Sequence, residues 1–383
     1  MNGIVRFREL DDAPLSDTYK WNDPPAGTIG ASVADMDVHL APPVAAALHD
    51  AVDRSSTGYV KSHMRGVADA IAAWHQRRFD QAVDAALVRF APNVVNGLIQ
   101  AATVLQPKAP RLIMNTPVYY PFFAVADAVE MQQVRVSMVE HAGRWVLDLD
   151  RMDAEAAEGG IILLCNPHNP TGAVPTREEL EGVAEIARRH GTPVISDEVH
   201  APLTYPGYRF VPFSEVAPDL AGRHITVTST SKSFNMPGIK FAWLAPGTPE
   251  LATAIDRLPE MLTYGTSSFG PAATVAATTQ GDQWLDELVG HLTERRDRLG
   301  ALLAERLPRT NWIAPEATFL AWLDFRAYGL PDEPATVLRA HCVDLSSGTV
   351  FGEEGKGHAR LNFGCSAATL ELMVDRIATA LEG

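Results

Sequence analysis

Residues 225–235 read Ile-Thr-Val-Thr-Ser-Thr-Ser-Lys-Ser-Phe-Asn, a β-branched run that ends in a cluster of hydroxyl groups around Lys232. The pattern predicts a buried strand that delivers one lysine into a polar pocket. A buried lysine amine has a lowered pKa and is a good nucleophile, and Schiff-base formation is its commonest use. Because most lysines are solvated surface charges, the meaning of Lys232 depends on the rest of the chain.

The composition is that of an ordinary globular protein. The 383 residues are 46% hydrophobic and 21% charged, and this length favours two or three domains. The net charge of −15 lacks the basic excess that non-specific nucleic-acid binding requires. The cysteines, Cys165, Cys342 and Cys365, lack metal-type spacing, so we expect no metal site and reduced thiols in the cytoplasm. Without a signal-peptide pattern or an apolar run of about 18 residues, no membrane partner is expected.

Strand-like and helical patterns alternate through the middle of the chain. Ile161-Ile-Leu-Leu-Cys165 is apolar throughout, as in a strand that is buried on both faces of a parallel sheet. Thr176-Arg-Glu-Glu179 is a capping box that opens a helix, which Gly191 ends. Further strands are expected at 112–114, 134–139, 193–196 and 225–229, and a helix at 122–129. This rhythm across residues 90–245 predicts an α/β domain with a mostly parallel sheet.

The two ends of the chain differ from this middle. We expect residues 1–45 to form an irregular N-terminal arm that contributes to a small domain, and residues 46–275 to form the large α/β domain. A long helical pattern over 284–307, strand-like stretches at 318–325 and 359–363 and a last helix over 368–381 follow. They predict a smaller α+β domain over residues 276–383.

Polar residues follow three of the predicted strands. They are Asn166-Pro-His-Asn-Pro-Thr-Gly172, Asp197 and Lys232. Ligands of parallel sheets bind at the carboxyl ends of the strands, so these residues are expected to share one site. A buried carboxylate such as Asp197 costs free energy unless a cation or hydrogen bonds compensate it, and a protonated pyridine nitrogen is one such partner.

Together these motifs resemble the fold-type I pyridoxal-phosphate enzymes of the class I and II aminotransferase superfamily. More narrowly, the chain resembles the cystathionine β-lyase group, the MalY/PatB-like carbon–sulfur lyases. The narrower resemblance rests on motifs that span residues 20–364: Lys20-Trp21, Val33-Ala-Asp-Met-Asp37, Gly58-Tyr59, Pro117-Val-Tyr-Tyr-Pro-Phe122, Cys165-Asn-Pro-His-Asn-Pro-Thr-Gly172, Asp197-Glu-Val-His200 and Arg360-Leu-Asn-Phe-Gly364. It implies an α/β fold with a large cofactor-binding domain, a mostly parallel seven-stranded-type sheet and a smaller α+β domain.

The resemblance also implies a role for each matching residue. Lys232 would hold pyridoxal 5′-phosphate as a Schiff base, and Asp197 would pair with its pyridine nitrogen. The other residues implied to bind the cofactor are Tyr119 on the ring face, Asn169 and His200 at the ring hydroxyl, and Asn96, Gly97, Leu98, Ser229 and Lys240 at the phosphate. Tyr59 would reach the phosphate from the second subunit of a homodimer. The substrate would contact Ala34, Asn169, Tyr119 and Arg360, whose guanidinium would hold the α-carboxylate bidentately.

Some of these assignments have alternatives. His200 could be a packing histidine, Tyr119 a core residue, and Arg360 a partner in a structural ion pair. Two residues depart from the family pattern: Ser32 stands where the family usually has tryptophan, and Asn96 stands in place of a proline. Because Ser32 could widen or repolarise the pocket, the identity of the substrate stays open.

The implied reaction is the α,β-elimination of L-cystathionine or another cysteine S-conjugate to a thiol, pyruvate and ammonia. The freed Lys232 would remove the Cα proton and protonate the departing thiolate, and the released aminoacrylate would hydrolyse. An aminotransferase would use the same residues, and a regulatory binding protein could keep the fold without the chemistry. A nicotinamide enzyme is disfavoured because no Gly-x-Gly-x-x-Gly follows a strand, and Gly352-Glu-Glu-Gly-Lys-Gly357 lacks the spacing of a P-loop.

Overall fold

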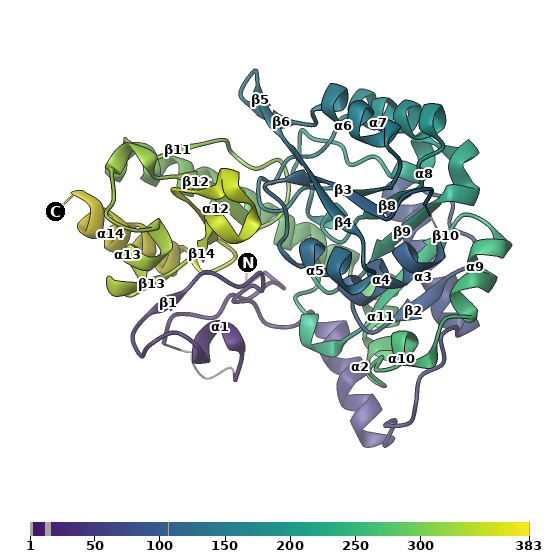
Figure 1. Cartoon of the computed structure of the whole chain (residues 1–383). Coiled ribbons are helices and arrows are strands. Elements are labelled where there is room, and N and C mark those ends of the chain that lie inside the picture. The colour runs from purple at the N-terminus through teal and green to yellow at the C-terminus, as the bar shows by residue number, and fades with distance from the viewer. Residues whose placement is uncertain (1–2, 12–16, 106, 383) are drawn as a thin grey trace.

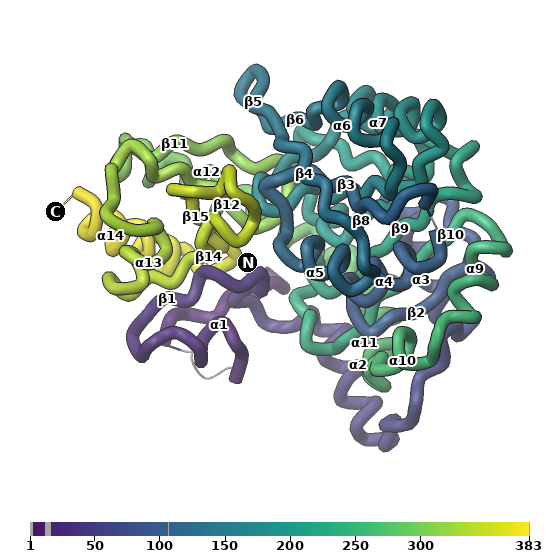
Figure 2. The backbone as a smooth tube through the Cα atoms, in the orientation of Figure 1, coloured from purple at the N-terminus to yellow at the C-terminus, as the bar shows by residue number. Residues whose placement is uncertain are grey.

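The computed structural model describes residues 3–11, 17–105 and 107–382. A seven-stranded sheet with helices on both faces forms a larger body, and a four-stranded sheet with its helices forms a smaller one (Figure 1). The N-terminal segment lies beside the C-terminal part of the chain, as the tube in Figure 2 makes clear. The domain boundaries expected at residues 45 and 275 stay a prediction.

The large sheet is mostly parallel, as the sequence predicts. Its strands, in spatial order, are β2 (Arg89–Ala91), β10 (Ala242–Pro246), β9 (His224–Thr228), β8 (Val194–Asp197), β7 (Ile161–Cys165), β3 (Arg111–Thr116) and β4 (Gln132–Ser137). Strands β9, β8, β7, β3 and β4 run parallel to one another, and β10 runs antiparallel to both β9 and β2. The carboxyl ends of β7, β8 and β9 therefore meet at one edge of the sheet.

Helices cover both faces of the large sheet. One face packs against α4 (Val94–Val104), α5 (Pro121–Ala128) and α9 (Pro249–Asp256), and the other against α6 (Leu149–Ala157), α7 (Arg177–His190) and α8 (Phe213–Val216). Successive side chains of a strand point to opposite faces. In β7, Ile161 and Leu163 accordingly belong to the first core, and Ile162 and Leu164 to the second. A strand between two helical layers needs apolar residues at every position, which explains its sequence.

The smaller body contains an antiparallel sheet and the arm. Its strands are β11 (Asn311–Trp312), β12 (Leu320–Asp324), β15 (His358–Asn362) and β14 (Ser346–Ser347), with helices α12 (Asp282–Arg306), α13 (Pro334–Ala340) and α14 (Ala367–Glu382). The arm carries α1 (Tyr19–Asn22) and β1 (Ile29–Gly30), and β1 pairs in parallel with β13 (Val343–Asp344). The first and last parts of the chain thus share one hydrophobic core.

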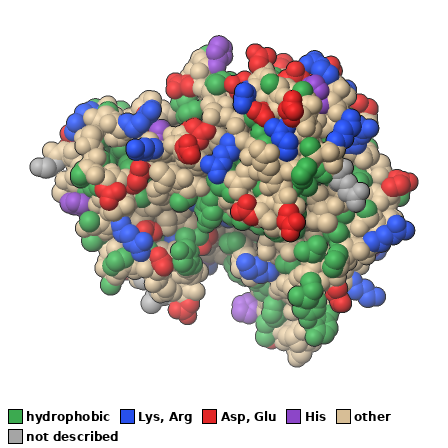
Figure 3. Space-filling view, in the orientation of Figure 1, with side chains coloured by type: hydrophobic (Ala, Val, Ile, Leu, Met, Phe, Trp, Pro, Cys, Tyr) green, Lys and Arg blue, Asp and Glu red, His purple; other side chains and the backbone are tan. Residues whose placement is uncertain are grey.

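The remaining elements join or extend the two bodies. Helices α2 (Pro42–Asp53) and α3 (Arg65–Phe79) pack against α11 (Gly270–Gln280), near the short α10 (Glu260–Thr263). A hairpin of β5 (Val139–His141) and β6 (Arg144–Val146) projects from the larger body (Figure 1). Within the described ranges, no helix is both long and apolar enough to cross a lipid bilayer. On the face in Figure 3, basic and acidic side chains are interspersed over both bodies.

Local sequence signals explain where α7 begins and ends. The Thr176 hydroxyl accepts the Glu179 N–H at 3.2 Å, and the Glu179 carboxylate accepts the Thr176 N–H at 2.9 Å. This reciprocal pair confirms the predicted capping box. Gly191 follows the helix with a φ of 67°, a left-handed conformation that glycine adopts without strain.

The arm is held at the edge of the large sheet by buried polar contacts. The Lys20 ammonium lies 2.9 Å from the Asp37 carboxylate, and both side chains are buried. The Asn235 amide receives the Met36 N–H at 2.7 Å and donates to the Met36 carbonyl at 2.6 Å. Asn362 of β15 donates to two further arm carbonyls at 2.6 and 2.7 Å. Because these polar groups are satisfied only together, residues 33–37 are fixed against both bodies.

Candidate active site

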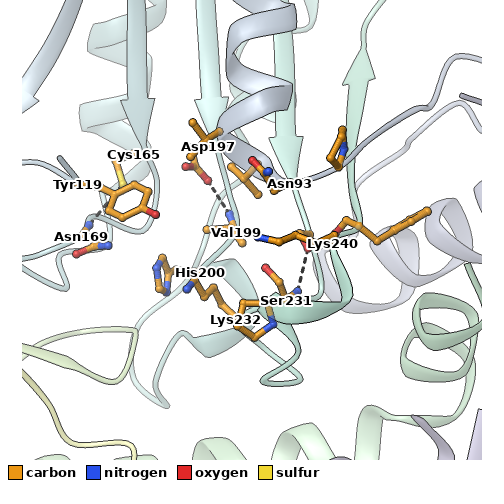
Figure 4. A pocket seen from close by; sticks show the side chains of 16 residues that line it. Asn93, Tyr119, Cys165, Asn169, Asp197, Val199, His200, Ser231, Lys232 and Lys240 are labelled. Carbon is orange, nitrogen blue, oxygen red and sulfur yellow. Dashed lines mark hydrogen bonds between the residues drawn. The ribbon is translucent and has the colours of Figure 1, made fainter. Parts of the chain in front are cut away.

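A cavity of about 380 Å³ opens at the carboxyl ends of β7, β8 and β9 (Figure 4). Its size lies within the roughly 300–1,000 Å³ range of small-molecule sites. The predicted site residues that line it are Tyr119, Asn169, Asp197, His200, Ser229, Lys232 and Lys240. They come from segments spread over residues 119–240, and they converge because the ligands of parallel sheets bind where the strands end.

Lys232 follows β9 and directs its amine into this cavity (Figure 4). Its Nζ donates a 2.7 Å hydrogen bond to the carbonyl oxygen of Ala34, in the arm. Burial lowers the pKa of Lys232 to about 8, against an opposing effect of the nearby Asp35. About a tenth of this amine is therefore uncharged at pH 7, far more than for a lysine with the usual pKa, and the uncharged form is the one that a nucleophile or general base requires.

Asp197 is the last residue of β8, and only 3% of its surface is exposed. Its Oδ1 accepts the Val199 N–H at 3.1 Å, and no Lys, Arg or His of the described chain forms an ion pair with it. Burial raises the pKa of Asp197 to about 7. A buried carboxyl group without a cation is costly, so the site is suited to a ligand that brings a positively charged N–H to this position.

Arg360 of β15 approaches the cavity from the smaller body. Its Nη1 donates to Asn169 Oδ1 at 3.0 Å, and its Nη2 donates to the Ser32 carbonyl at 2.6 Å and to Ser346 Oγ at 3.1 Å. Burial lowers the pKa of Arg360 to about 10. No carboxylate of the described residues pairs with it, and its buried Nε has no hydrogen-bond partner there. A structural ion pair is thus not its role in this chain, and an anionic ligand would compensate the charge.

Tyr119 and Asn169 form one wall of the cavity (Figure 4). The Tyr119 N–H donates to the Asn169 carbonyl at 2.9 Å, which ties the two turns together. Since Asn169 Oδ1 accepts from Arg360, its side-chain amide N–H groups are the ones that can donate to a ligand. Burial raises the pKa of Tyr119 to about 12, so its hydroxyl keeps its proton at neutral pH.

His200 is buried beside Lys232 and Asn169. Burial holds its pKa well below the usual value, so the imidazole is neutral. Its ring packs 6.1 Å from the ring of Phe319, but its Nδ1 has no partner among the described atoms. A buried nitrogen without a partner at a cavity wall favours a ligand contact over a purely packing role.

The residues expected to form the phosphate turn lie inside α4. Asn96, Gly97 and Leu98 do not line the cavity; Asn93, Val94 and Val95 do. The Asn93 side chain caps α4 by accepting the Asn96 N–H at 2.9 Å, and the Gly97 N–H donates to the Asn93 carbonyl. The N–H groups of Asn96 and Gly97 are therefore already hydrogen-bonded at the start of the helix, and the Leu98 side chain belongs to the core.

The first N–H groups of α4 are candidates for an anion site. Those of Val94 and Val95 have no intrahelical acceptor, and the helix dipole favours negative charge at this end. An asparagine directly before a helical pattern is an N-cap signal, which could have placed the helix start at Val94 from the sequence. A side chain at Gly97 would lie 2.7 Å from Val227, so Gly97 serves the packing of α4 on β9.

Two hydroxyls and one amine complete this end of the cavity. Ser229 Oγ donates to the Phe241 carbonyl at 2.6 Å and accepts the Ser231 N–H at 2.9 Å. The Ser229 hydroxyl proton is therefore already used, whereas Ser231, which the sequence analysis did not single out, also lines the cavity. The exposed Lys240 extends its side chain toward the same end (Figure 4).

Tyr59 lies outside this cavity. Its side chain is 91% exposed, and its ring packs 5.9 Å from that of Tyr264 at a separate surface hollow. Within one chain it reaches none of the residues around Lys232. Its predicted contact with a second subunit stays a prediction.

The donor set fits pyridoxal 5′-phosphate. Lys232 supplies an amine for the aldehyde, Asp197 an uncompensated carboxyl for the ring nitrogen, and Tyr119 an aromatic face. The N-terminus of α4 with Ser231 and Lys240 supplies N–H, hydroxyl and ammonium groups for a phosphate dianion. No cluster of three or more metal-type ligands occurs in the described part of the chain.

Comparisons with known proteins agree with this geometry. Residues 29–377 match the family described as aminotransferase class I and II. A putative cystathionine β-lyase of Mycobacterium tuberculosis is 37% identical, over 95% of this chain and 94% of its own. The cystathionine β-lyase PatB of Bacillus subtilis is 32% identical, over 91% of each chain. The crystal structure of a putative pyridoxal-phosphate-dependent β-cystathionase from Corynebacterium diphtheriae superimposes with a TM-score of 0.93, at 30% identity over 99% of each chain.

Proposed function

Because this chain belongs to the class I and II aminotransferase family, and within it to the cystathionine β-lyase group, we propose that it is a carbon–sulfur β-lyase. Its fold is the fold-type I architecture, and its cofactor is pyridoxal 5′-phosphate. The reaction is the α,β-elimination of L-cystathionine or another cysteine S-conjugate to a thiol, pyruvate and ammonia.

One observation carries the proposal beyond the family likeness. A single site contains a partly buried amine, Lys232, together with a buried carboxyl group, Asp197, and a buried guanidinium, Arg360, which both lack a counter-charge among the described residues. A cofactor with a protonated ring nitrogen would compensate Asp197, and a substrate with an α-carboxylate would compensate Arg360. The two missing charges are thus those of the cofactor and of an amino acid.

Lys232 performs the proton transfers. The bound cofactor supplies an electron sink that stabilises negative charge at the substrate Cα. The Lys232 amine, with its pKa lowered to about 8, removes the Cα proton and then delivers a proton to the sulfur as the Cβ–S bond breaks. The Ala34 carbonyl, 2.7 Å from Nζ, orients this amine on the side of the arm. Water hydrolyses the remaining three-carbon product to pyruvate and ammonia.

The other residues bind and orient. Asp197 holds the proton on the ring nitrogen, because a charge pair in this buried position is favoured over a bare carboxylate. Arg360 binds the α-carboxylate and, through its bond to Asn169, couples substrate position to the ring. Tyr119 stacks on the ring, and the neutral His200 contacts it by its unpartnered nitrogen.

The functional unit that we propose is a homodimer in the cytoplasm. The exposed Tyr59 would be ordered by a second subunit and would reach that subunit's phosphate site. The three cysteines are all unpaired, which suits a reducing compartment.

The test combines two product measurements. Purified, cofactor-loaded protein is mixed with L-cystathionine and with S-alkyl cysteines, and pyruvate and free thiol are followed together. We expect equal amounts of both, and we expect Lys232→Ala to lack both turnover and the visible absorbance of the bound cofactor. Thiol release without pyruvate, or full activity of Lys232→Ala, would overturn the proposal.

The same assay separates the two alternatives. An aminotransferase would form no pyruvate from these substrates, and its cofactor absorbance would change with an amino acid and return with a keto acid. A regulatory binding protein would show cofactor absorbance without either reaction. The intact set of Lys232, Asp197, Asn169 and Arg360 argues against this last possibility.

A further inference from the structure

The loop between β14 and β15, residues 348–357, joins the two sides of the site; we call it the bridging loop. It contains two short 3₁₀ turns, Gly348–Phe351 and Glu353–Gly355. The turns pack backbone against backbone, since a Cβ added to Gly355 would lie 1.9 Å from the Gly348 oxygen. Gly352 between them has a φ of 140°. Only glycine fits these positions, so the loop is held in one compact shape.

Phe351 of this loop contacts Arg360 and the residue that precedes Tyr119. The Arg360 guanidinium carbon lies 4.8 Å from the centre of the fully buried Phe351 ring. The Phe351 carbonyl accepts the N–H of Val118, the residue before Tyr119, at 2.8 Å. A cation on an aromatic face is attracted by the ring, most strongly where water is excluded. Phe351 therefore supports the guanidinium plane and fixes the turn that carries Tyr119.

Glu354 ties the same loop to the large sheet. Its Oε1 accepts hydrogen bonds from the Thr116 hydroxyl at 2.6 Å and from the Ser137 hydroxyl at 2.5 Å. These hydroxyls stand on the last residues of β3 and β4. Hydrogen bonds to an ionised acceptor are stronger than neutral ones, so Glu354 holds the smaller body at a defined distance from the sheet edge.

We propose that Phe351 and Glu354 are positioning residues for the substrate α-carboxylate. Phe351 orients the guanidinium of Arg360, and Glu354 sets its distance from Asn169 and the cavity. Neither residue touches the reacting atoms, so both act on the binding of the acid group and leave the proton transfers to Lys232. That the ligand is an α-amino acid rests on the proposed function.

The experiment compares two ligands that differ in the carboxylate alone. 2-Aminoisobutyrate has an amino group and a carboxylate but no α-hydrogen, and isopropylamine lacks the carboxylate. The dissociation constant of each is measured from the change in visible absorbance of the cofactor-loaded protein, without turnover. The variants are Phe351→Leu and Glu354→Ala, with the neighbouring exposed Glu353→Ala as matched control.

Phe351→Leu is expected to raise the dissociation constant of 2-aminoisobutyrate about tenfold, because a desolvated cation–π contact is lost. Glu354→Ala is expected to raise the same dissociation constant only about threefold, because Glu354 is exposed and water partly replaces its two hydrogen bonds. The dissociation constant of isopropylamine should change by less than about twofold in both variants. The control Glu353→Ala should bind both ligands as the wild type does.

If the binding of both ligands weakened equally, the variants would have a general packing defect and the proposal would be overturned. An unchanged affinity for 2-aminoisobutyrate would also overturn it. If Phe351→Leu does not fold, Glu354→Ala decides the question by itself. Failure of the β-lyase assay is a separate result, because the ligand comparison needs no elimination. For a substrate that the wild type cleaves, KM should rise in both variants while kcat stays within about twofold.

Discussion

Replacing Asp197 with asparagine is expected to change how the stability of the cofactor-free protein depends on pH. Burial raises the pKa of Asp197 to about 7 in the fold, from a usual value of 3.8. Between these values the folded state binds more protons than the unfolded state, so the free energy of unfolding falls as pH rises and levels off above about 7. From pH 5 to pH 7 the loss due to Asp197 is on the order of 2 kcal/mol.

The assay is urea unfolding of the cofactor-free protein at pH 5, 6, 7 and 8, followed by tryptophan fluorescence. Asp197→Asn should remove the part of the pH dependence of the free energy of unfolding that Asp197 causes. Burial also raises the pKa of the adjacent Glu198 to about 7. Glu198 should therefore cause a similar part of the pH dependence, which Glu198→Gln should remove. The matched control is Asp219→Asn, because the Arg188 hydrogen bond holds the pKa of this surface carboxyl below its usual value. If Asp197→Asn kept the wild-type dependence of stability on pH between pH 5 and pH 7, Asp197 would not be the group that titrates in this range.

Three further experiments test other parts of the structure. Lys20→Met leaves the buried Asp37 carboxylate without its 2.9 Å partner and should cost about 3–5 kcal/mol in urea unfolding; a cost below about 1 kcal/mol would contradict this. Gly97→Ala places a Cβ 2.7 Å from a core valine of β9 and should lower the free energy of unfolding by about 1–3 kcal/mol. A Tm equal to that of the wild type would contradict this. Tyr59→Ala and Lys232→Ala subunits should each lack full activity, and mixed dimers should regain it because one site then has both native residues. Verified mixed dimers without activity would exclude the cross-subunit contact.

Much of the site could be predicted because its residues stand at the ends of buried parallel strands. Asp197 directly ends the apolar β8, and Lys232 follows the β-branched β9, so their convergence follows from sheet geometry alone. The role of Arg360 could not be derived in this way. Its strand belongs to a second sheet, and its contact with Asn169, 191 positions away, depends on how the two bodies pack.

Other features escaped prediction for local reasons. Asn96, Gly97 and Leu98, which the resemblance assigned to the phosphate, lie inside α4, because the start of this helix is marked in the sequence only by a single capping residue, Asn93. Strand β10, Ala242–Pro246, was not predicted because its five residues show no alternation and end in proline. Proline is tolerated there because β2 pairs only with Ala242–Leu244, so Pro246 has a neighbouring strand on one side only. The arm's place beside Lys232 rests on Lys20, Asn235 and Asn362, which no local pattern reveals.

The dependence of the site on the arm has a consequence for synthesis of the protein. The Ser32 carbonyl that receives Arg360 leaves the ribosome 328 residues before its donor. The arm strand β1 has no β13 to pair with, and the Ser32 carbonyl has no Arg360 to bind, until these late residues have emerged, although the large sheet can already fold. Contacts of such long sequence separation form late and slowly. Binding competence should therefore appear only on completed chains, and prematurely terminated ones would be folded in part but inert.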